Sequence, residues 1–251
     1  MSLSVVIVTL NEEANLARTL QSVTWVDEII IVDSGSSDRT REIAESFRAK
    51  FWVEPWRGFA AQKNLALGKA SCDWVLSLDA DEEVEPALAE EIRMALVANP
   101  EVTGFWVPRK NFFLGRWIRH GGFYPDPKLR LFRCGVGQFQ DRLVHEDVRL
   151  NGPTARLQHH LLHHAYPTLD SYLDHMNRYS SLGAQMAVAQ GQRGFSLVDI
   201  VIRPRLTLFY NYVLRGGFLD GREGLLLHLY HTEYVSWKYA KAWERSRGRM
   251  G

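Results

Sequence analysis

The chain has 251 residues, of which 46% are hydrophobic and 24% charged, a composition typical of a globular protein with a substantial core. Its net charge of +1 hides an uneven distribution, because residues 1–199 carry 21 basic and 25 acidic side chains, whereas residues 200–251 carry nine and four. Cys72 and Cys134 lie 62 positions apart, which excludes a disulfide framework and a cysteine zinc site. The sequence shows no signal-peptide pattern and no run of about 18 uncharged apolar residues, so we expect a cytoplasmic protein without a membrane-spanning helix.

Apolar runs and helical segments alternate along the first hundred residues. Strands are expected at residues 3–10, 29–32, 51–53 and 74–78. Helices are expected after Asn11, which would cap the first of them, and at residues 41–47, 60–67 and 86–97. This alternation predicts an α/β fold with a Rossmann-like, doubly wound and mostly parallel sheet.

Polar clusters follow three of the predicted strands: Thr9-Leu10-Asn11-Glu12, Asp33, and Asp79-Ala80-Asp81. Ligands of open α/β sheets bind beyond the carboxyl ends of the strands, so we expect the three clusters to converge. The carboxylates of Asp79 and Asp81 are hard oxygen ligands that suit Mg²⁺ or Mn²⁺. A solvated acidic turn is the alternative for so short a motif.

Four segments carry a resemblance to a known family: residues 6–12, residues 31–40, Gln62-Lys63-Asn64, and residues 78–82. In these segments the sequence resembles family 2 glycosyltransferases of the GT-A fold. Residues 144–146 and 217–221 are similar to a subgroup that includes lipopolysaccharide inner-core β-glucosyltransferases. The resemblance implies an inverting, metal-dependent enzyme that moves a hexose, with glucose expected, from a nucleotide-diphosphate sugar to a saccharide or lipid-linked acceptor. The expected donor is a UDP-sugar, and the expected pathway builds lipopolysaccharide core or another cell-envelope glycan.

The resemblance also implies how the chain is divided. Residues 1–200 would form the GT-A domain, with the nucleotide sugar bound by residues 1–100 and the acceptor by residues 101–200. Residues 201–251 would form a C-terminal helical extension in which basic and apolar residues are mixed. Helices of this composition lie on anionic membrane surfaces, so we expect peripheral association with the inner face of the cytoplasmic membrane. A docked subdomain and an oligomer contact are the alternatives, and no nucleic-acid-binding motif accompanies the basic residues.

Around the donor, the resemblance assigns these roles: Thr9, Leu10, Asn11 and Glu12 border the nucleotide, Asp33 accepts a hydrogen bond from the base or ribose, Lys63 meets phosphate, and Asp79-Ala80-Asp81 forms the metal site. Asp81 is the expected ligand of the Mg²⁺ or Mn²⁺ ion that bridges both phosphates, and Asp79 would contact the ribose, the metal or its water. A turn or cap is the alternative role for Asp33, and an ordinary surface lysine is the alternative for Lys63.

Glycosyl transfer needs a base that takes the proton of the attacking acceptor hydroxyl. The resemblance places this base at Glu146, with the neighbouring Asp147 as the rival. Adjacent residues of an extended segment point to opposite faces, so we expect only one of the two to face the acceptor. An exposed acidic turn is the alternative for both.

Arg130 and His164 are candidates for contacts with the acceptor or the diphosphate, as the resemblance implies. Arg130 stands in an alternation of basic and apolar residues that equally describes a half-buried strand. His164 belongs to a cluster of four, His159, His160, His163 and His164. Pairs four residues apart could bind zinc on a helix, one histidine, His164 or His163, could reach the metal or the diphosphate, and ordinary packing is the alternative for each.

Two functions of other classes compete with glycosyl transfer. A nucleotidyltransferase would also use a doubly wound sheet and paired carboxylates, but it would normally carry a glycine-rich, basic loop after the first strand, where this chain has Thr9-Leu10-Asn11-Glu12. A non-catalytic membrane scaffold of the same fold would have lost the metal carboxylates or the base, and both are present in the sequence.

Overall fold

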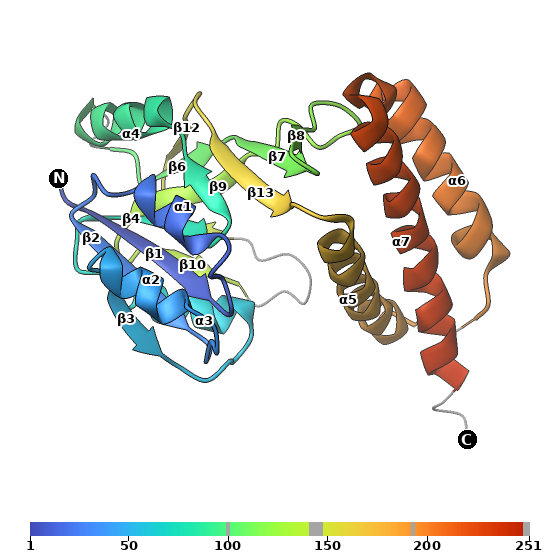
Figure 1. Cartoon of the computed structure of the whole chain (residues 1–251). Coiled ribbons are helices and arrows are strands. Elements are labelled where there is room, and N and C mark those ends of the chain that lie inside the picture. The colour runs from blue at the N-terminus through green and yellow to red at the C-terminus, as the bar shows by residue number, and fades with distance from the viewer. Residues whose placement is uncertain (99–100, 141–147, 192–193, 248–251) are drawn as a thin grey trace. The chain divides into compact units, whose positions relative to one another are not determined.

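The computed structural model describes residues 1–98, 101–140, 148–191 and 194–247 (Figure 1). The chain forms two compact units, unit 1 with residues 1–109 and 126–163, and unit 2 with residues 110–125 and 164–251. The predicted boundary at residue 200 does not coincide with this division. Within unit 2, the long helices α5 (Leu169–Ala189) and α7 (Gly221–Arg247) pack on each other, which joins residues on both sides of position 200.

Unit 1 is built on a seven-stranded sheet with the order β12-β6-β9-β4-β1-β2-β3. Its strands are β1 (Leu3–Thr9), β2 (Glu28–Asp33), β3 (Lys50–Val53), β4 (Trp74–Asp79), β6 (Gly104–Val107), β9 (Lys128–Arg133) and β12 (Thr154–Arg156). β4, β1, β2 and β3 are parallel neighbours, and β9 runs antiparallel between β4 and β6. The predicted mostly parallel sheet is therefore confirmed, with β9 as the antiparallel member.

Helices cover both faces of this sheet: α1 (Leu16–Gln21), α2 (Thr40–Ser46), α3 (Phe59–Leu67) and α4 (Pro86–Ala98). Alternate residues of β1 serve the two faces, because successive side chains of a strand point to opposite sides. Ile7 belongs to the same core cluster as Leu16 of α1 and Ile92 of α4. Val6 belongs to the other cluster, with Ala60 of α3. Burial on both faces explains why β1 is apolar along its whole length.

The first helix begins later than the sequence suggests. Asn11 adopts a left-handed φ of 55°, and the residue at the start of α1 is Asn15. The backbone N–H of Asn11 donates to Ser36 Oγ at 2.7 Å, and that of Glu12 donates to Thr40 Oγ1 at 2.8 Å. The expected helix cap at Asn11 is therefore wrong, because these N–H groups bind side chains of the next βα loop.

Two smaller strand groups complete unit 1. β5 (Glu82–Val84) pairs antiparallel with the first residues of β13 (Leu161–Tyr166), and this pairing puts His163 opposite Glu82. β10 (Gly137–Phe139) pairs antiparallel with β11 (Val148–Leu150).

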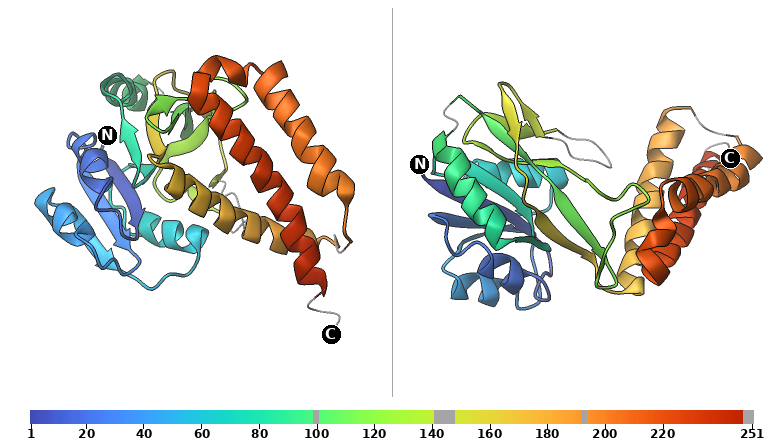
Figure 2. Two further views of the ribbon diagram at one scale, coloured as in Figure 1. Left: turned by 45° about the vertical axis from the view of Figure 1, so that its right-hand side comes forward. Right: turned by 90° about the horizontal axis from the view of Figure 1, so that it is seen from above.

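Unit 2 is mainly helical. A single helical stretch is made of the π-helical η1 (Val198–Ile202), α6 (Arg203–Leu208) and the π-helical η2 (Phe209–Leu214), and the 3₁₀ turn η3 (Gly217–Asp220) leads into α7. α7 packs on α5 and on α6 and lies between them in Figures 1 and 2. The strands β7 (Arg109–Phe113) and β8 (Arg116–Trp117) form a hairpin. None of the helices in the described ranges has the length and apolar character needed to cross a bilayer.

Residues 217–221 have a structural role within unit 2. The buried carboxylate of Asp220 accepts hydrogen bonds from the backbone N–H of Arg119 at 3.1 Å and of His120 at 2.8 Å. Gly217 lies against the buried ring of His228, so that a Cβ at this position would collide with the imidazole. This segment therefore fastens the turn after β8 to the start of α7.

Candidate active site

The carboxyl ends of β1, β2 and β4 bring the predicted clusters together. In the register of the sheet, Thr9 stands beside Asp33 and Val8 stands beside Asp79. Thr9 Oγ1 donates a hydrogen bond to Asp33 Oδ2 at 2.8 Å, and both side chains are buried. The convergence expected from the strand ends is present in the fold.

Asp33 organises the turn that follows β2. Its Oδ1 accepts hydrogen bonds from the backbone N–H of Gly35 at 2.8 Å and of Ser36 at 2.7 Å. Its Oδ2 accepts from the hydroxyls of Thr9 and Ser36. Gly35 has a φ of +98°, a conformation that favours glycine. The turn role considered as the alternative is thus observed, and the contact of Asp33 with a base or ribose stays a prediction.

The loop after β1 is locked to the loop after β2. Asn11 Oδ1 accepts a hydrogen bond from the backbone N–H of Ser37 at 2.9 Å. Leu10 is half exposed at the rim, whereas Glu12 is partly buried. Burial raises the pKa of Glu12, against a lowering hydrogen bond from Asn15, and the negative charge of Asp81 raises it further. Glu12 therefore adds to the negative potential at the end of β4.

Asp79 is held by two cations at the end of β4. Lys63 Nζ lies 2.8 Å from Asp79 Oδ1, and Arg130 pairs with Oδ2 of the same carboxylate. Burial alone raises the pKa of Asp79, but the charges of Arg130 and Lys63 outweigh it and hold the pKa well below its ordinary value. Asp79 is therefore ionised, and both of its oxygens are engaged by side chains of the protein.

The motif around Lys63 explains how α3 is positioned. Gln62 is fully buried and donates to the carbonyl oxygen of Glu54 at 3.1 Å. The amide of Asn64 donates to the carbonyl of Phe139 and accepts from its N–H, both at 2.8 Å. The flanking amides thus fix the helix on which Lys63 reaches Asp79.

A buried ion network continues from Arg130. Glu82 is fully buried and accepts hydrogen bonds from Arg130 at 2.8 Å and from Arg109 at 2.9 Å. Arg109 also pairs with Asp126 at 2.7 Å. The sequence analysis missed Arg109 and Asp126, since isolated charges in a loop-rich region carry no periodic signal. Glu82 directly follows the Asp79-Ala80-Asp81 motif, and that position could have marked it.

Asp81 has a different neighbour. Its Oδ2 lies 3.4 Å from Nε2 of His163, which β13 presents beside β5. Burial raises the pKa of Asp81, but His163 more than compensates, so that the pKa lies below its ordinary value. The backbone carbonyl of the intervening Ala80 accepts a hydrogen bond from Thr19 Oγ1 at 2.6 Å, which anchors the turn to α1.

The remaining histidines of the cluster have other partners. Their segment is a strand and the loop before it, so the helical zinc pair considered from the sequence is wrong. Nδ1 of His159 lies 2.9 Å from Glu91, and Nδ1 of His160 lies 3.0 Å from Glu85. His164 stacks on Phe112 with ring centroids 5.1 Å apart. Its contact with the acceptor or the diphosphate stays a prediction.

The residues at the end of β4 fit a metal ion that is completed by substrate. Within the described residues, no three His, Cys, Asp or Glu side chains form a ready-made metal cluster. Mg²⁺ typically takes one or two carboxylates and completes its shell with substrate phosphates and water. Asp81 and His163 offer such a partial ligand set, whereas both Asp79 oxygens are bound by Lys63 and Arg130.

The predicted base lies outside the described residues. Glu146 and its rival Asp147 both belong to residues 141–147. Their assignments stay predictions.

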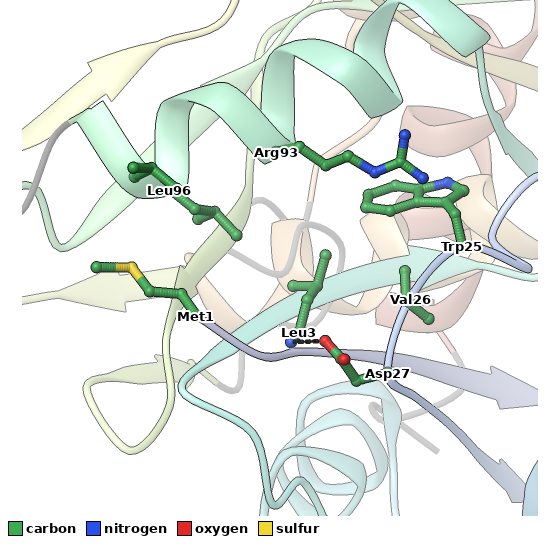
Figure 3. Close-up of a pocket in the computed structure, with 8 residues that line it drawn as sticks. Met1, Leu3, Trp25, Val26, Asp27, Arg93 and Leu96 are labelled. Atoms are coloured by element: carbon green, nitrogen blue, oxygen red, sulfur yellow. Dashed lines mark hydrogen bonds between the residues drawn. The ribbon is translucent and has the colours of Figure 1, made fainter.

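A cavity of about 220 Å³ lies at the other end of the sheet (Figure 3). It is lined by the first residue of β1, Leu3, by the loop before β2, and by α4. Arg93 lies over the indole of Trp25, and Asp27 accepts a hydrogen bond from the N–H of Leu3. Because β1 separates it from Thr9 by about 20 Å, this cavity is not part of the acidic site.

The fold and the site define an α/β protein with an acidic ligand site at the carboxyl ends of parallel strands. The chain belongs to glycosyl transferase family 2, because the model of that family matches residues 4–149. The match favours glycosyl transfer over the nucleotidyltransferase alternative, and the predicted family is confirmed.

Relatives along the whole chain agree with this assignment. The chain is 31% identical over 252 residues to the lipopolysaccharide core biosynthesis glycosyltransferase LpsC of Rhizobium meliloti, covering 98% of this chain and 93% of the relative. It is also 31% identical over 238 residues to an uncharacterized glycosyltransferase of Rickettsia typhi, covering 89% and 80%. The crystal structure of S. aureus TarS in complex with UDP-GlcNAc aligns with a TM-score of 0.54 at 15% identity, over 99% of this chain and 92% of that one. This likeness confirms the predicted GT-A fold class.

Proposed function

We propose that this chain is a metal-dependent, inverting hexosyltransferase that uses a nucleotide-diphosphate sugar. UDP-glucose is the donor that we expect. The observation that carries the proposal is the unequal treatment of the two carboxylates, with Asp79 neutralised by Lys63 and Arg130 and Asp81 beside His163. One carboxylate is thus fixed by the protein, while the other keeps the negative charge that a divalent cation needs.

Asp81, together with His163, would hold Mg²⁺ or Mn²⁺ beside the donor phosphates. When bound, the cation would stabilise the negative charge that develops on the leaving diphosphate. Asp79, kept ionised by Lys63 and Arg130, would accept a hydrogen bond from the ribose. Thr9, Asn11 and the turn at Asp33 would border the nucleotide at the ends of β1 and β2.

The transfer step would be a direct displacement. The acceptor hydroxyl oxygen attacks the anomeric carbon while the bond from that carbon to the diphosphate oxygen breaks. Glu146, or Asp147 as its rival, takes the hydroxyl proton, and the leaving nucleoside diphosphate keeps the electron pair. Attack from the opposite face inverts the anomeric carbon, so an α-linked donor gives a β-glycoside without a covalent intermediate on the protein.

The acceptor that we propose is a saccharide or a lipid-linked saccharide of the cell envelope. The likeness to an enzyme named for lipopolysaccharide core biosynthesis, along nearly the whole of both chains, supports lipopolysaccharide core as the product. Synthesis of such acceptors on a membrane would place the protein peripherally on the inner face of the cytoplasmic membrane.

A screen of nucleotide sugars tests the proposal. A ligand that binds only the native state raises the melting temperature by mass action. We expect saturable stabilisation by a UDP-sugar when Mn²⁺ is present, with a smaller effect in EDTA, and slow hydrolysis of that sugar. If none of the nucleotide sugars stabilises the protein or is hydrolysed, the chain is a non-catalytic member of the fold.

A further inference from the structure

The helical stretch from η1 to η2 exposes a row of apolar side chains in unit 2. Nine large apolar residues along it are between 36% and 64% exposed: Leu197, Val198, Val201, Ile202, Leu206, Phe209, Tyr210, Val213 and Leu214. Phe218 and Leu219 continue the row into η3 and are also exposed. Monomeric soluble proteins rarely expose apolar patches of this extent, and such patches mark sites of interaction. We call these eleven residues the apolar ridge.

The opposite side of the same stretch is occupied by the protein itself. Pro204 is buried, and the stretch packs on α7. Ser236 Oγ of α7 donates to the carbonyl oxygen of Ile200 at 2.9 Å, and Arg203 lies over the ring of Tyr239. The apolar ridge is therefore the outward face of a helix whose inner face is already used.

Positive charge accompanies the apolar ridge. Between residues 197 and 215 the chain carries Arg203, Arg205 and Arg215 and a single acidic residue, Asp199, which pairs with Arg203 at 2.7 Å. A second copy of this face would present the same positive charge, which disfavours self-association. An anionic lipid surface instead complements the arginines at its headgroups and the apolar side chains below them.

We propose that the apolar ridge is a membrane-docking surface, on which η1, α6 and η2 lie flat in the interfacial region of an anionic bilayer. This inference rests on the peripheral location given in the proposed function and identifies the residues responsible for it. The helical stretch is about 27 Å long, so it can lie along the surface over its full length. The excess of positive charge is small, so the apolar side chains provide most of the binding and the arginines provide the preference for anionic lipid.

Vesicle flotation tests this surface with the full-length chain. The double variant Leu206→Ser/Phe209→Ser removes two large side chains from the centre of the ridge, and Met94→Ser/Val97→Ser removes two exposed apolar side chains from α4 of unit 1 as a matched control. With vesicles of phosphatidylethanolamine and phosphatidylglycerol, we expect the wild type and the control to float, and the ridge variant to bind at least roughly tenfold more weakly. Binding should be weaker on phosphatidylcholine vesicles and should persist in part at high salt.

Three readouts keep the outcome decisive. Equal melting temperatures of both variants show that they are folded, and a second ridge variant, Val213→Ser/Leu214→Ser, repeats the test at the other end. The proposal is overturned if the ridge variants bind vesicles as the wild type does, if the wild type does not bind, or if the wild type forms a dimer in solution that the ridge variants lose. Donor hydrolysis is measured without vesicles, so a failure of the proposed catalysis is seen separately from a failure of docking.

Discussion

Lys63 and Asp79 form an ion pair across the strand ends of unit 1, with Nζ 2.8 Å from Oδ1, and Arg130 binds the other oxygen of the same carboxylate. Asp81, two residues further on, faces His163 instead. The two carboxylates of the motif therefore differ in role, although their spacing in the sequence gives them equal weight. The first is a fixed part of the protein, and the second is the one available to a cation.

Arg130→Met should lower the free energy of unfolding by about 3 kcal/mol, because it leaves the buried Glu82 and the partly buried Asp79 without their shared cation. Urea denaturation measures this difference. Arg39→Met is the matched control, since Arg39 pairs with Glu42 on the surface and its removal should cost less than about 1 kcal/mol. Equal losses from both substitutions would show that the Arg130 network is not structural.

Glu28 should make stability depend on acid. Burial raises its pKa, but hydrogen bonds from Lys50, Ser4 and Ser71 outweigh this and lower the pKa from 4.5 to about 2. A depressed carboxyl pKa contributes stability that is complete above the unfolded value and is lost as the pH falls from about 4.5 to about 2. The contribution at neutral pH is roughly 3 kcal/mol.

Glu28→Gln should therefore destabilise the protein at pH 7 and flatten the decline in stability between pH 5 and pH 3, as urea denaturation at each pH would show. Glu42→Gln, at an exposed ion pair, serves as the control and should leave the profile almost unchanged. A wild-type profile that is flat over this range would contradict the role given to Glu28.

Glu146→Gln should reduce turnover by about 10² to 10⁴, the usual contribution of general base catalysis, while donor affinity stays unchanged. Gln keeps the shape of Glu but cannot accept the proton. Asp147→Asn is the internal control and should have a mild effect. Loss of turnover in Asp147→Asn alone would make Asp147 the base, and full activity in both would move the search to Asp141.

The fold of unit 1 was predictable because its signals are local and periodic. Ile7 and Val6 face opposite sides of the sheet, so β1 had to be apolar throughout, and each polar cluster marks the end of a parallel strand. The approach of Thr9 to Asp33 follows from that order alone, because neighbouring parallel strands end at the same edge.

The rest depended on contacts between distant segments, which leave no periodic signal. Arg109 and Asp126 join the network around Glu82 from separate loops. The cap expected at Asn11 failed because its N–H binds Ser36 of another loop, a partner that local sequence cannot indicate. The division of the chain also depends on helix packing, since α5 joins α7 from before the boundary that composition suggested.

The central claim is that Asp81 supports a divalent cation that is required for donor binding. Calorimetric titration of UDP tests it most directly, with Mn²⁺ or with EDTA, on the wild type, Asp81→Asn, and Asp73→Asn as a control at the amino end of β4. We predict tight binding by the wild type and the control in Mn²⁺, and at least the roughly 10- to 100-fold weakening that disturbed metal sites show, both for Asp81→Asn and for the wild type in EDTA. Equal affinity for UDP with and without the metal, or an unchanged affinity of Asp81→Asn, would contradict it.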